Sequence, residues 1–297
     1  MEKIIKLKKL FNSNKINAYL VPKNDEFFGE YIPEKKDKLK FISNFSGSYG
    51  FALITKNKNY LFVDGRYTLQ AKLESGKNFK IITIPNKLPS DILKKKKLKI
   101  GFDPKLFTKK TVNLFFNKKI CELVSINQNL IDKLWTKKQE NNPKKFEVLP
   151  QIATGQNYKL KLKKLINILD KKKINLQFIT ASENIAWLLN IRGKDSNFTP
   201  VPNCYMSIDI SKKIYLFCDL RKIKKSFKKK YKNIKIVDIK KTFSHLSQIS
   251  NKKILIDSST CSIHFESVLN KKNKIINLSD PIYFMKSIKS KIEIQNT

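Results

Sequence analysis

The chain has 297 residues, 41% of them hydrophobic, and carries a formal net charge of +38 at pH 7. This length and composition favour a globular protein of two domains and exclude a membrane-spanning protein, because no apolar run approaches the roughly 20 residues that cross a bilayer. Only Arg66, Arg192 and Arg221 among the 62 basic residues are Arg, and because base readout and bidentate phosphate contacts favour Arg, the charge argues against specific nucleic-acid binding and is typical of Lys spread over solvated faces.

The first half of the sequence alternates helices and strands. At the N-terminus, Ile4, Leu7, Leu10 and Phe11 recur at helical spacing and no apolar signal-peptide core is present, which predicts an amphipathic helix and a cytoplasmic protein. Short apolar runs predict strands at 16–21, 51–55, 60–64, 79–84, 98–102 and 121–125. Helical patterns predict helices at 1–13, 38–42, 67–74, 108–116 and 129–135.

The polar stretch KKQENNPKK at 137–145 is the strongest linker signal in the sequence. It predicts a first domain at 1–140, a linker at 141–157, a second domain at 158–280 and the start of a further helix at 281–297. In the second domain, strands are predicted at 176–180, 204–210, 213–219, 234–237, 253–257 and 274–278, and helices at 160–169, 182–190, 243–249 and 262–269. The two domains are predicted to share one architecture, although no sequence repeat relates them.

Two local signals delimit the helix predicted at 182–190. Thr180 and Glu183 match the T-x-x-E pattern of a capping box at the start of the helix. Gly193 is predicted to end it, because glycine readily adopts the left-handed conformation of a helix C-cap.

The segment YLFVDGRYTLQAK at 60–72 is the most informative in the chain. An apolar strand ends at Asp64, a Gly turn follows, and a helical pattern begins at once. Ligands of open α/β sheets bind at this kind of strand-to-helix edge. Asp64 either pairs with Arg66 or caps the helix, or Arg66 projects outward and holds a substrate carboxylate or carbonyl with its planar guanidinium. Both alternatives stay open, and the same argument makes Arg192 in NIRGKD a second candidate.

No catalytic centre or metal site can be assembled from the residues. His245 and His264 are too few for a His-rich metal site or a His-based triad, and the four Cys have no metal-like spacing. No nucleophile elbow, HExxH helix, phosphate loop or dinucleotide fingerprint is present. From its residues alone, the chain consists of two α/β domains with ligand-contact candidates and no catalytic centre.

Nine collinear segments resemble the N-terminal part of the long, three-domain Xaa-Pro aminopeptidases of the aminopeptidase P family. They include FISNFSGSYGFAL at 41–53 and YLFVDGRYTLQA at 60–71. The others lie at 16–33, 99–104, 129–139, 181–195, 199–202, 255–260 and 280–297. The resemblance implies an α/β fold of two creatinase N-terminal-like (ribonuclease-H-like) domains, each a mixed β-sheet flanked by helices. It also implies that 281–297 leads into a catalytic pita-bread domain that this chain lacks.

In that family the catalytic domain holds two divalent metals, typically manganese, and hydrolyses the bond before a proline at the second position of short peptides. The resemblance therefore implies that this chain is the non-catalytic part of a metallo-aminopeptidase, a hydrolase, and is inactive alone. It implies a role in homodimerisation and in substrate access, and no metal or cofactor within the chain. A standalone binding or scaffold module that has lost the peptidase domain is the alternative.

The resemblance also suggests substrate-cleft residues. In relatives the DGRY stretch lies toward the cleft, which makes Arg66, Tyr67 and Asp64 candidates. The loop from Arg192 to Asp195 is a second candidate. Relatives commonly carry His where this chain has Phe27 and Phe198, so either a substrate contact is altered here or Phe198 packs in the fold.

Overall fold

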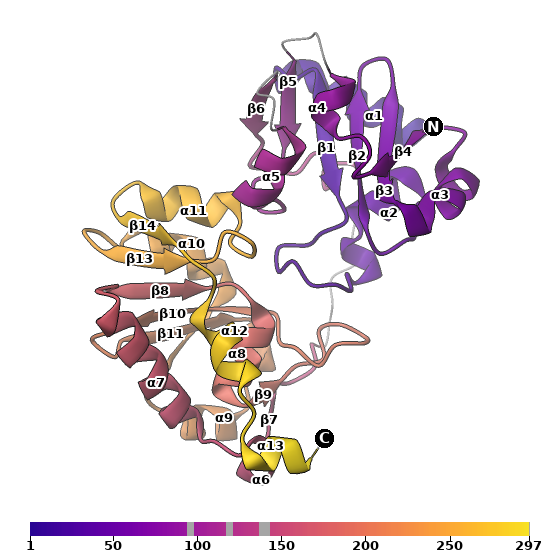
Figure 1. Cartoon of the computed structure of the whole chain (residues 1–297). Helices are drawn as coiled ribbons and strands as arrows, with labels where there is room; N and C mark the ends of the chain where they lie inside the picture. The colour runs from indigo at the N-terminus through magenta and orange to yellow at the C-terminus, as the bar shows by residue number, and fades with distance from the viewer. Residues whose placement is uncertain (94–97, 117–120, 137–142, 297) are drawn as a thin grey trace. The chain divides into compact units, whose positions relative to one another are not determined.

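The computed structural model describes residues 1–93, 98–116, 121–136 and 143–296. The chain folds into two compact units, Met1–Gln139 and Glu140–Thr297 (Figure 1). Each unit has a six-stranded mixed sheet with helices packed against it, which confirms the predicted fold class. None of the described helices is long and apolar enough to cross a membrane.

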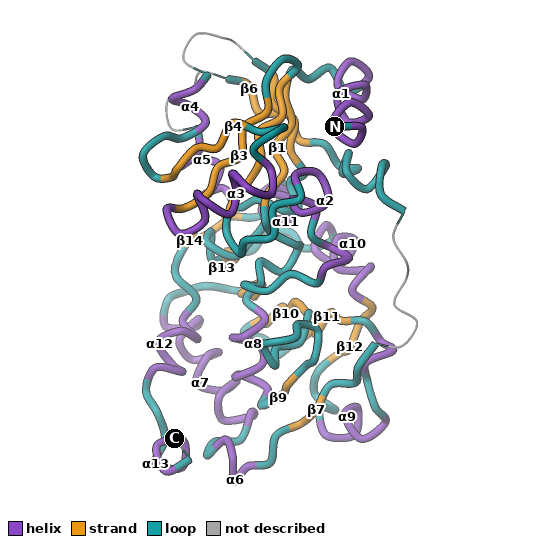
Figure 2. The backbone as a smooth tube through the Cα atoms, turned by 90° about the vertical axis from the view of Figure 1, so that its right-hand side faces the viewer, coloured by secondary structure: helices purple, strands orange, loops and turns teal. Residues whose placement is uncertain are grey.

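In the first unit, the strand order of the sheet is β4-β3-β2-β1-β5-β6. Its strands are β1 (Ala18–Pro22), β2 (Gly50–Thr55), β3 (Asn59–Asp64), β4 (Lys80–Ile84), β5 (Lys99–Phe102) and β6 (Glu122–Ser125). Its helices are α1 (Glu2–Ser13), α2 (Lys38–Ser43), α3 (Thr68–Ser75), α4 (Pro89–Ile92), α5 (Lys109–Phe115) and the 3-10 helices η1 (Glu34–Lys36) and η2 (Gly65–Tyr67). β2 is antiparallel to β1 and β3, and the other neighbours are parallel. β1 is buried throughout, because helices lie on both sides of the sheet (Figure 2).

In the second unit, the strand order of the sheet is β12-β11-β10-β8-β13-β14. Its strands are β8 (Leu176–Ile179), β10 (Cys204–Asp209), β11 (Ile214–Cys218), β12 (Lys235–Asp238), β13 (Lys253–Ile256) and β14 (Lys274–Asn277). Its helices are α7 (Tyr158–Lys171), α8 (Ser182–Leu189), α9 (Lys225–Lys230), α10 (Thr242–Ser247), α11 (Ile263–Asn270), α12 (Pro281–Ser287), α13 (Lys291–Gln295) and the 3-10 helices η3 (Leu220–Lys222) and η4 (Ile239–Lys241). β10 is antiparallel to β8 and β11, and the other neighbours are parallel.

The segment predicted as a linker, 141–157, differs from that prediction. Its described part contains β7 (Glu147–Val148), which pairs antiparallel with β9 (Ile191–Arg192), and helix α6 (Gln151–Thr154). The pairing gives the backbone polar groups of residues 147 and 148 partners within the second unit. Residues 141 and 142 lie outside the described residues.

The helix predicted at 129–135 is wrong, because side chains hold this segment in turns. Asn129 Oδ1 accepts the backbone N–H of Ile131 at 2.9 Å. The hydroxyl of Tyr19 accepts the N–H of Leu130 at 3.3 Å. Side-chain acceptors of this kind compete with a regular helix for the backbone.

The predicted capping box of α8 is also wrong. Thr180 exchanges a hydroxyl hydrogen bond of 2.9 Å with Thr260 instead of capping the helix. Glu183 accepts a hydrogen bond of 2.7 Å from the hydroxyl of Tyr283. The N-cap position is occupied by Ala181, whose side chain accepts no hydrogen bond. Both side chains that the sequence pattern assigned to the cap therefore form hydrogen bonds with residues distant in sequence.

The two units repeat one another strand for strand. β1 to β6 take the places that β8, β10, β11, β12, β13 and β14 take in the second sheet. The triplet Lys-Ile-Asn precedes the first strand of each, at 15–17 and at 173–175, and its Lys has a φ of 53° or 54°. In both units the Asn side chain of this triplet accepts the backbone N–H of a Lys that opens the fifth strand, Lys99 or Lys253, at 2.8 Å.

The helix after the first strand ends in the same way in both units. Asn44, with a φ of 65°, ends α2, and Asn190, with a φ of 57°, ends α8. The prediction that Gly193 ends α8 is therefore wrong, because Asn is the other residue that readily adopts the left-handed C-cap conformation.

Helix α1 in the first unit and helix α7 in the second each place a lysine at this helix C-terminus. Lys3 Nζ donates to the Phe41 carbonyl at 3.0 Å and lies 4.4 Å from the ring centroid. Lys161 Nζ donates to the Trp187 carbonyl at 2.9 Å and lies 3.9 Å from the indole centroid. A cation is favoured at this end of a helix, where the last carbonyl groups lack helical partners.

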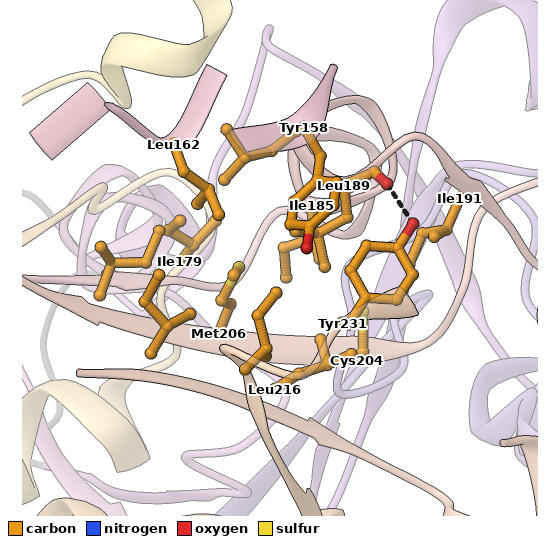
Figure 3. Close-up of a cluster of buried hydrophobic side chains, with 14 of the residues drawn as sticks. Tyr158, Leu162, Ile179, Ile185, Leu189, Ile191, Cys204, Met206, Leu216 and Tyr231 are labelled. Carbon is orange, nitrogen blue, oxygen red and sulfur yellow. Dashed lines mark hydrogen bonds between the residues drawn. The ribbon is translucent and has the colours of Figure 1, made fainter. Parts of the chain in front are cut away.

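The main core of the second unit lies between helices α7 and α8 and the sheet (Figure 3). Figure 3 shows Leu162, Ile179, Ile185, Met206 and Leu216 pointing into it. The hydroxyl of Tyr231 donates to the Leu189 carbonyl at 2.6 Å, so its polar end is satisfied. Cys204 and Cys218 pair in register across β10 and β11 and are fully buried, as expected for thiols that pack as small apolar groups.

Lys161 is the most deeply buried cation in this core, with 1% of its surface exposed. Its Nζ also donates to Asn190 Oδ1 at 2.7 Å. Burial lowers the pKa of this amine to about 8. A neutral amine still has two N–H groups for the two oxygen acceptors, so deprotonation removes the desolvation penalty without breaking either hydrogen bond.

We predict that the stability of the protein rises with pH because of Lys161. Between about pH 8 and the unfolded pKa of about 10.4, the unfolded chain binds more protons than the folded one, so the free energy of unfolding increases through this window. As the pH rises through this window, the free energy of unfolding of the wild type should increase by up to about 3 kcal/mol relative to that of Lys161→Met. Urea titrations at pH 7.5 and 10 measure the two free energies of unfolding. Lys164→Met, on the same helix, is the control. Equal pH slopes in wild type and Lys161→Met would contradict the assignment.

Candidate functional site

Asp64 and Arg66 form a compact ion pair at the end of β3. The Asp64 carboxylate accepts the backbone N–H of Arg66 at 2.9 Å and so caps η2. It also accepts Arg66 Nε at 3.2 Å and Nη2 at 2.7 Å. These hydrogen bonds lower the pKa of Asp64 and raise the pKa of Arg66. The structure therefore contains both the local pair and the cap that the sequence left open.

Arg66 remains accessible in spite of this pair. Its side chain is 74% exposed, and its guanidinium carbon lies 5.3 Å from the ring centroid of Tyr67. The Tyr67 hydroxyl forms a hydrogen bond of 2.7 Å with Ser48, in the glycine-rich loop before β2. In the same loop, a Cβ on Gly47 would lie 2.3 Å from the Phe45 ring and 3.0 Å from the Tyr67 ring. This loop and the Asp64 turn thus hold Tyr67 and Arg66 in one place.

The same Asp-x-Arg turn recurs in the second unit. Asp219 follows β11, accepts the backbone N–H of Arg221 at 3.0 Å, and accepts Arg221 Nε at 3.0 Å and Nη2 at 2.7 Å. Two of the three Arg residues therefore serve the same turn in equivalent places. The sequence signal that was missed is an apolar strand followed by D-x-R in both halves. Because the turn is repeated, its first role is to fix the strand-to-helix connection.

The charged residues of the Arg192–Asp195 segment have separate partners, and Lys194 pairs with Glu147 at 2.9 Å. Arg192 is half-buried at the end of β9, where Nη1 donates to the Ile191 carbonyl at 2.9 Å and burial lowers the pKa of the guanidinium. Asp195 is nearly buried, pairs with Lys222 and accepts the backbone N–H of Asn203 at 2.7 Å. Within the described residues, Arg192 and Asp195 form no ion pair with each other.

Phe27 and Phe198 lie in different surroundings. Phe27 is half-buried, and Lys36 Nζ lies 4.9 Å from its ring centroid. The same ammonium pairs with Glu26 at 2.6 Å and Asp25 at 3.5 Å. Phe198 is 75% exposed, so it does not pack in the core.

The C-terminal helices are anchored by a buried polar network that sequence reasoning missed. Asp280 caps α12 and accepts hydrogen bonds of 2.8 Å from Gln177 Nε2 and from Asn184 Nδ2. Its own backbone N–H donates to Asp257 Oδ2 at 2.9 Å. Burial raises the pKa of the Asp280 carboxyl. The direction of the chain from residue 281 onward is thereby fixed to the sheet.

The last helix, α13, is also fastened to the second unit. Glu293 belongs to a capping box with Ser290 and accepts a hydrogen bond of 3.3 Å from Trp187 Nε1. Gly155 has a φ of +65°, and a Cβ there would lie 2.3 Å from Ser290 Oγ. Only glycine therefore lets α6 and α13 approach this closely.

The described residues do not fit a dinuclear metal centre. Among them, no group of three or more His, Cys, Asp or Glu side chains could hold a metal ion. The acidic side chains at the candidate site are engaged with Arg, Lys and backbone N–H groups.

Comparison with known proteins gives consistent matches along the whole chain. The model of the Creatinase/Prolidase N-terminal domain matches residues 3–134, and a second model of that description matches residues 137–293. The probable Xaa-Pro aminopeptidase P of Laccaria bicolor is 30% identical over 99% of this chain and 48% of its own length. Xaa-Pro aminopeptidase 1 of Dictyostelium discoideum is 33% identical over 99% of this chain and 50% of its own length.

A solved structure agrees with these relatives. The X-prolyl aminopeptidase of Caenorhabditis elegans, described as a cytosolic enzyme with a di-nuclear active site, superposes with a TM-score of 0.89 at 25% identity. The match covers 99% of this chain and 52% of that enzyme. The chain thus spans about half the length of the relatives it matches. Since one family model alone covers more than half of the chain and the other covers most of the rest, the chain belongs to the Creatinase/Prolidase N-terminal domain family, with two such domains in tandem.

Proposed function

We propose that the chain is the non-catalytic N-terminal part of a cytosolic Xaa-Pro aminopeptidase. The observation that carries the proposal is the match of nearly the whole chain to about half of each relative, with both N-terminal domains in tandem. The metallopeptidase activity then belongs to a further domain, whose two divalent metals, manganese in our proposal, would supply Lewis-acid chemistry for hydrolysis of the bond before proline. The residues of this chain position substrate and the adjoining domain.

The C-terminal network supports a positioning role. Asp280, Glu293 and Gly155 fix the course of α12 and α13 on the second unit. A polypeptide that continues from α13 would therefore leave the second unit from a defined place. In our proposal the complete protein is a homodimer that admits short peptides with proline second.

In this proposal Arg66, with Tyr67 and Asp64, shapes access to the substrate cleft. Asp64 engages Nε and Nη2 of the guanidinium, and the 74% exposed side chain retains a donor edge for a peptide carbonyl or carboxylate. Arg192 is half-buried and Asp195 is held by Lys222, so we assign that loop a secondary, structural contribution to the cleft.

We predict that the 297-residue chain does not hydrolyse Xaa-Pro peptides with added Mn²⁺, because its described residues offer no metal site.

Replacing the matched half of the Dictyostelium enzyme with this chain should give a protein that does hydrolyse Xaa-Pro peptides. The catalytic half alone should lose its preference for proline at the second position. Release of the N-terminal residue is measured by mass spectrometry. Turnover by the chain alone, or a folded but inactive chimera, would refute the proposal.

The repeated turn provides a matched test of Arg66. Arg66→Ala and Arg221→Ala remove the same local hydrogen bonds, so both should lower the melting temperature of the active chimera by similar small amounts. Only Arg66→Ala should raise KM for Xaa-Pro peptides, by about tenfold, the effect of losing one charge-assisted hydrogen bond. Initial rates over a range of peptide concentrations measure KM. Equal KM values for the two variants would limit Arg66 to the structural role.

A further inference from the structure

Helix α3 presents an apolar stripe to solvent. Leu69 and Leu73, one turn apart, are 75% and 88% exposed, and Leu73 is the most exposed large apolar residue of the described chain. Lys72 in the helix and Lys77, two residues beyond its end, are also exposed, and within the described residues neither forms an ion pair. Residues i and i+4 share one helix face, so Leu69 and Leu73 form one surface, which is called the α3 face together with Lys72 and Lys77.

The α3 face is held rigidly from behind. Glu74 accepts hydrogen bonds of 2.8 and 2.6 Å from the backbone N–H and the hydroxyl of Ser46. Gln70 Nε2 also donates to Ser46 Oγ at 2.8 Å. The buried hydroxyl of Ser75 donates to the Ser43 carbonyl at 2.7 Å. Because α3 is already ordered, binding of a partner would carry no entropic cost for ordering this helix.

The repeat supplies an internal comparison. Helix α9 takes the place of α3 in the second unit, since each follows an Asp-x-Arg turn and leads to an edge strand, β4 or β12. α9 carries Lys228, Lys229 and Lys230, and its large apolar residue, Phe227, is buried. The fold therefore does not require exposed leucines at this place. In a chain that puts Lys on most solvated faces, two leucines exposed by 75% and 88% at one turn's spacing on α3 indicate a partner.

We propose that the α3 face docks an acidic amphipathic helix of another protein. Two leucines spaced by one turn accept apolar side chains at i, i+3 and i+4 of a helix laid against them. The exposed Lys72 and Lys77, close in sequence to these leucines, add positive charge to the α3 face and so select acidic flanks on the partner.

Charge argues against a second copy as the occupant, and apolar area argues against a membrane. A second copy would bring Lys72 and Lys77 of both chains together, and each chain already carries a net charge of +38. The homodimer of the complete protein would therefore use a different surface. A membrane surface would need a larger apolar area than one two-turn helix provides.

The probe is an 18-residue helical peptide of Leu, Ala and Glu with Leu on one face. A scrambled peptide of the same composition and charge, without an apolar face, measures attraction to the net charge alone. In 150 mM salt, where charges are screened beyond about 8 Å, fluorescence anisotropy should show at least tenfold tighter binding of the amphipathic peptide to the 297-residue chain. Leu69→Ser/Leu73→Ser should abolish this difference.

Two further variants separate the leucines from general effects. Leu114→Ser/Leu160→Ser removes leucines that are 56% and 55% exposed elsewhere and should keep the tenfold difference. Lys72→Glu/Lys77→Glu should weaken binding of the acidic peptide and strengthen binding of a peptide with Lys in place of Glu. Circular dichroism melts establish that every variant is folded.

Several results would overturn the proposal. One is equal binding of the two peptides to wild type, and another is a preference that survives Leu69→Ser/Leu73→Ser. Self-association in sedimentation that depends on these leucines would identify a second copy as the occupant. Leucine-dependent binding to phosphatidylserine vesicles would identify a membrane surface instead.

Discussion

The fold depends on one recurring interaction, an Asp or Asn side chain that accepts the backbone N–H two residues further along the chain. It occurs at Asp25, Asp64, Asp103, Asn129, Asn157, Asp209, Asp219, Asp238, Asp257 and Asp280. Most of these residues end or follow strands, where the chain turns and a backbone donor loses its regular partner. A Lys side chain has no acceptor for this purpose, so even a chain with 62 basic residues keeps its acids at the turns.

Repetition of the module changes how single residues are interpreted. Arg66 alone looks like a residue reserved for a ligand in a Lys-rich chain. Arg221, in the same geometry, shows that this turn uses Arg because a planar fork closes on the carboxylate two residues earlier. Functional differences are then sought where the two copies diverge, as α3 and α9 do in their exposed faces.

The two copies also differ at their C-terminal ends. In the first unit Trp135 stacks on Phe41 with ring centroids 4.7 Å apart. In the second unit α13 covers the equivalent helix position, where Glu293 accepts the indole N–H of Trp187. In both units, the polypeptide that follows the last strand of the sheet therefore covers this helix position.

The sequence alone was sufficient for the elements with strong periodicity. Ile4, Leu7 and Phe11 are buried along α1 as their spacing indicated, and the apolar runs became the central strands, because burying apolar surface dominates the choice of local structure. The family resemblance likewise follows from the motifs of the sequence alone, because those motifs are contiguous and need no knowledge of which residues meet in space.

Tertiary structure decided what depends on partners distant in sequence. Thr180 and Glu183 have the spacing of a capping box, but Thr260 and Tyr283 take their side chains from across the fold. The repeat stayed hidden because its matches, such as the Lys-Ile-Asn triplets, are short and separated by unequal loops, whereas hydrogen-bond geometry aligns them. A side chain binds the nearest suitable donor or acceptor in space, and sequence spacing measures that distance only within one helix, strand or turn.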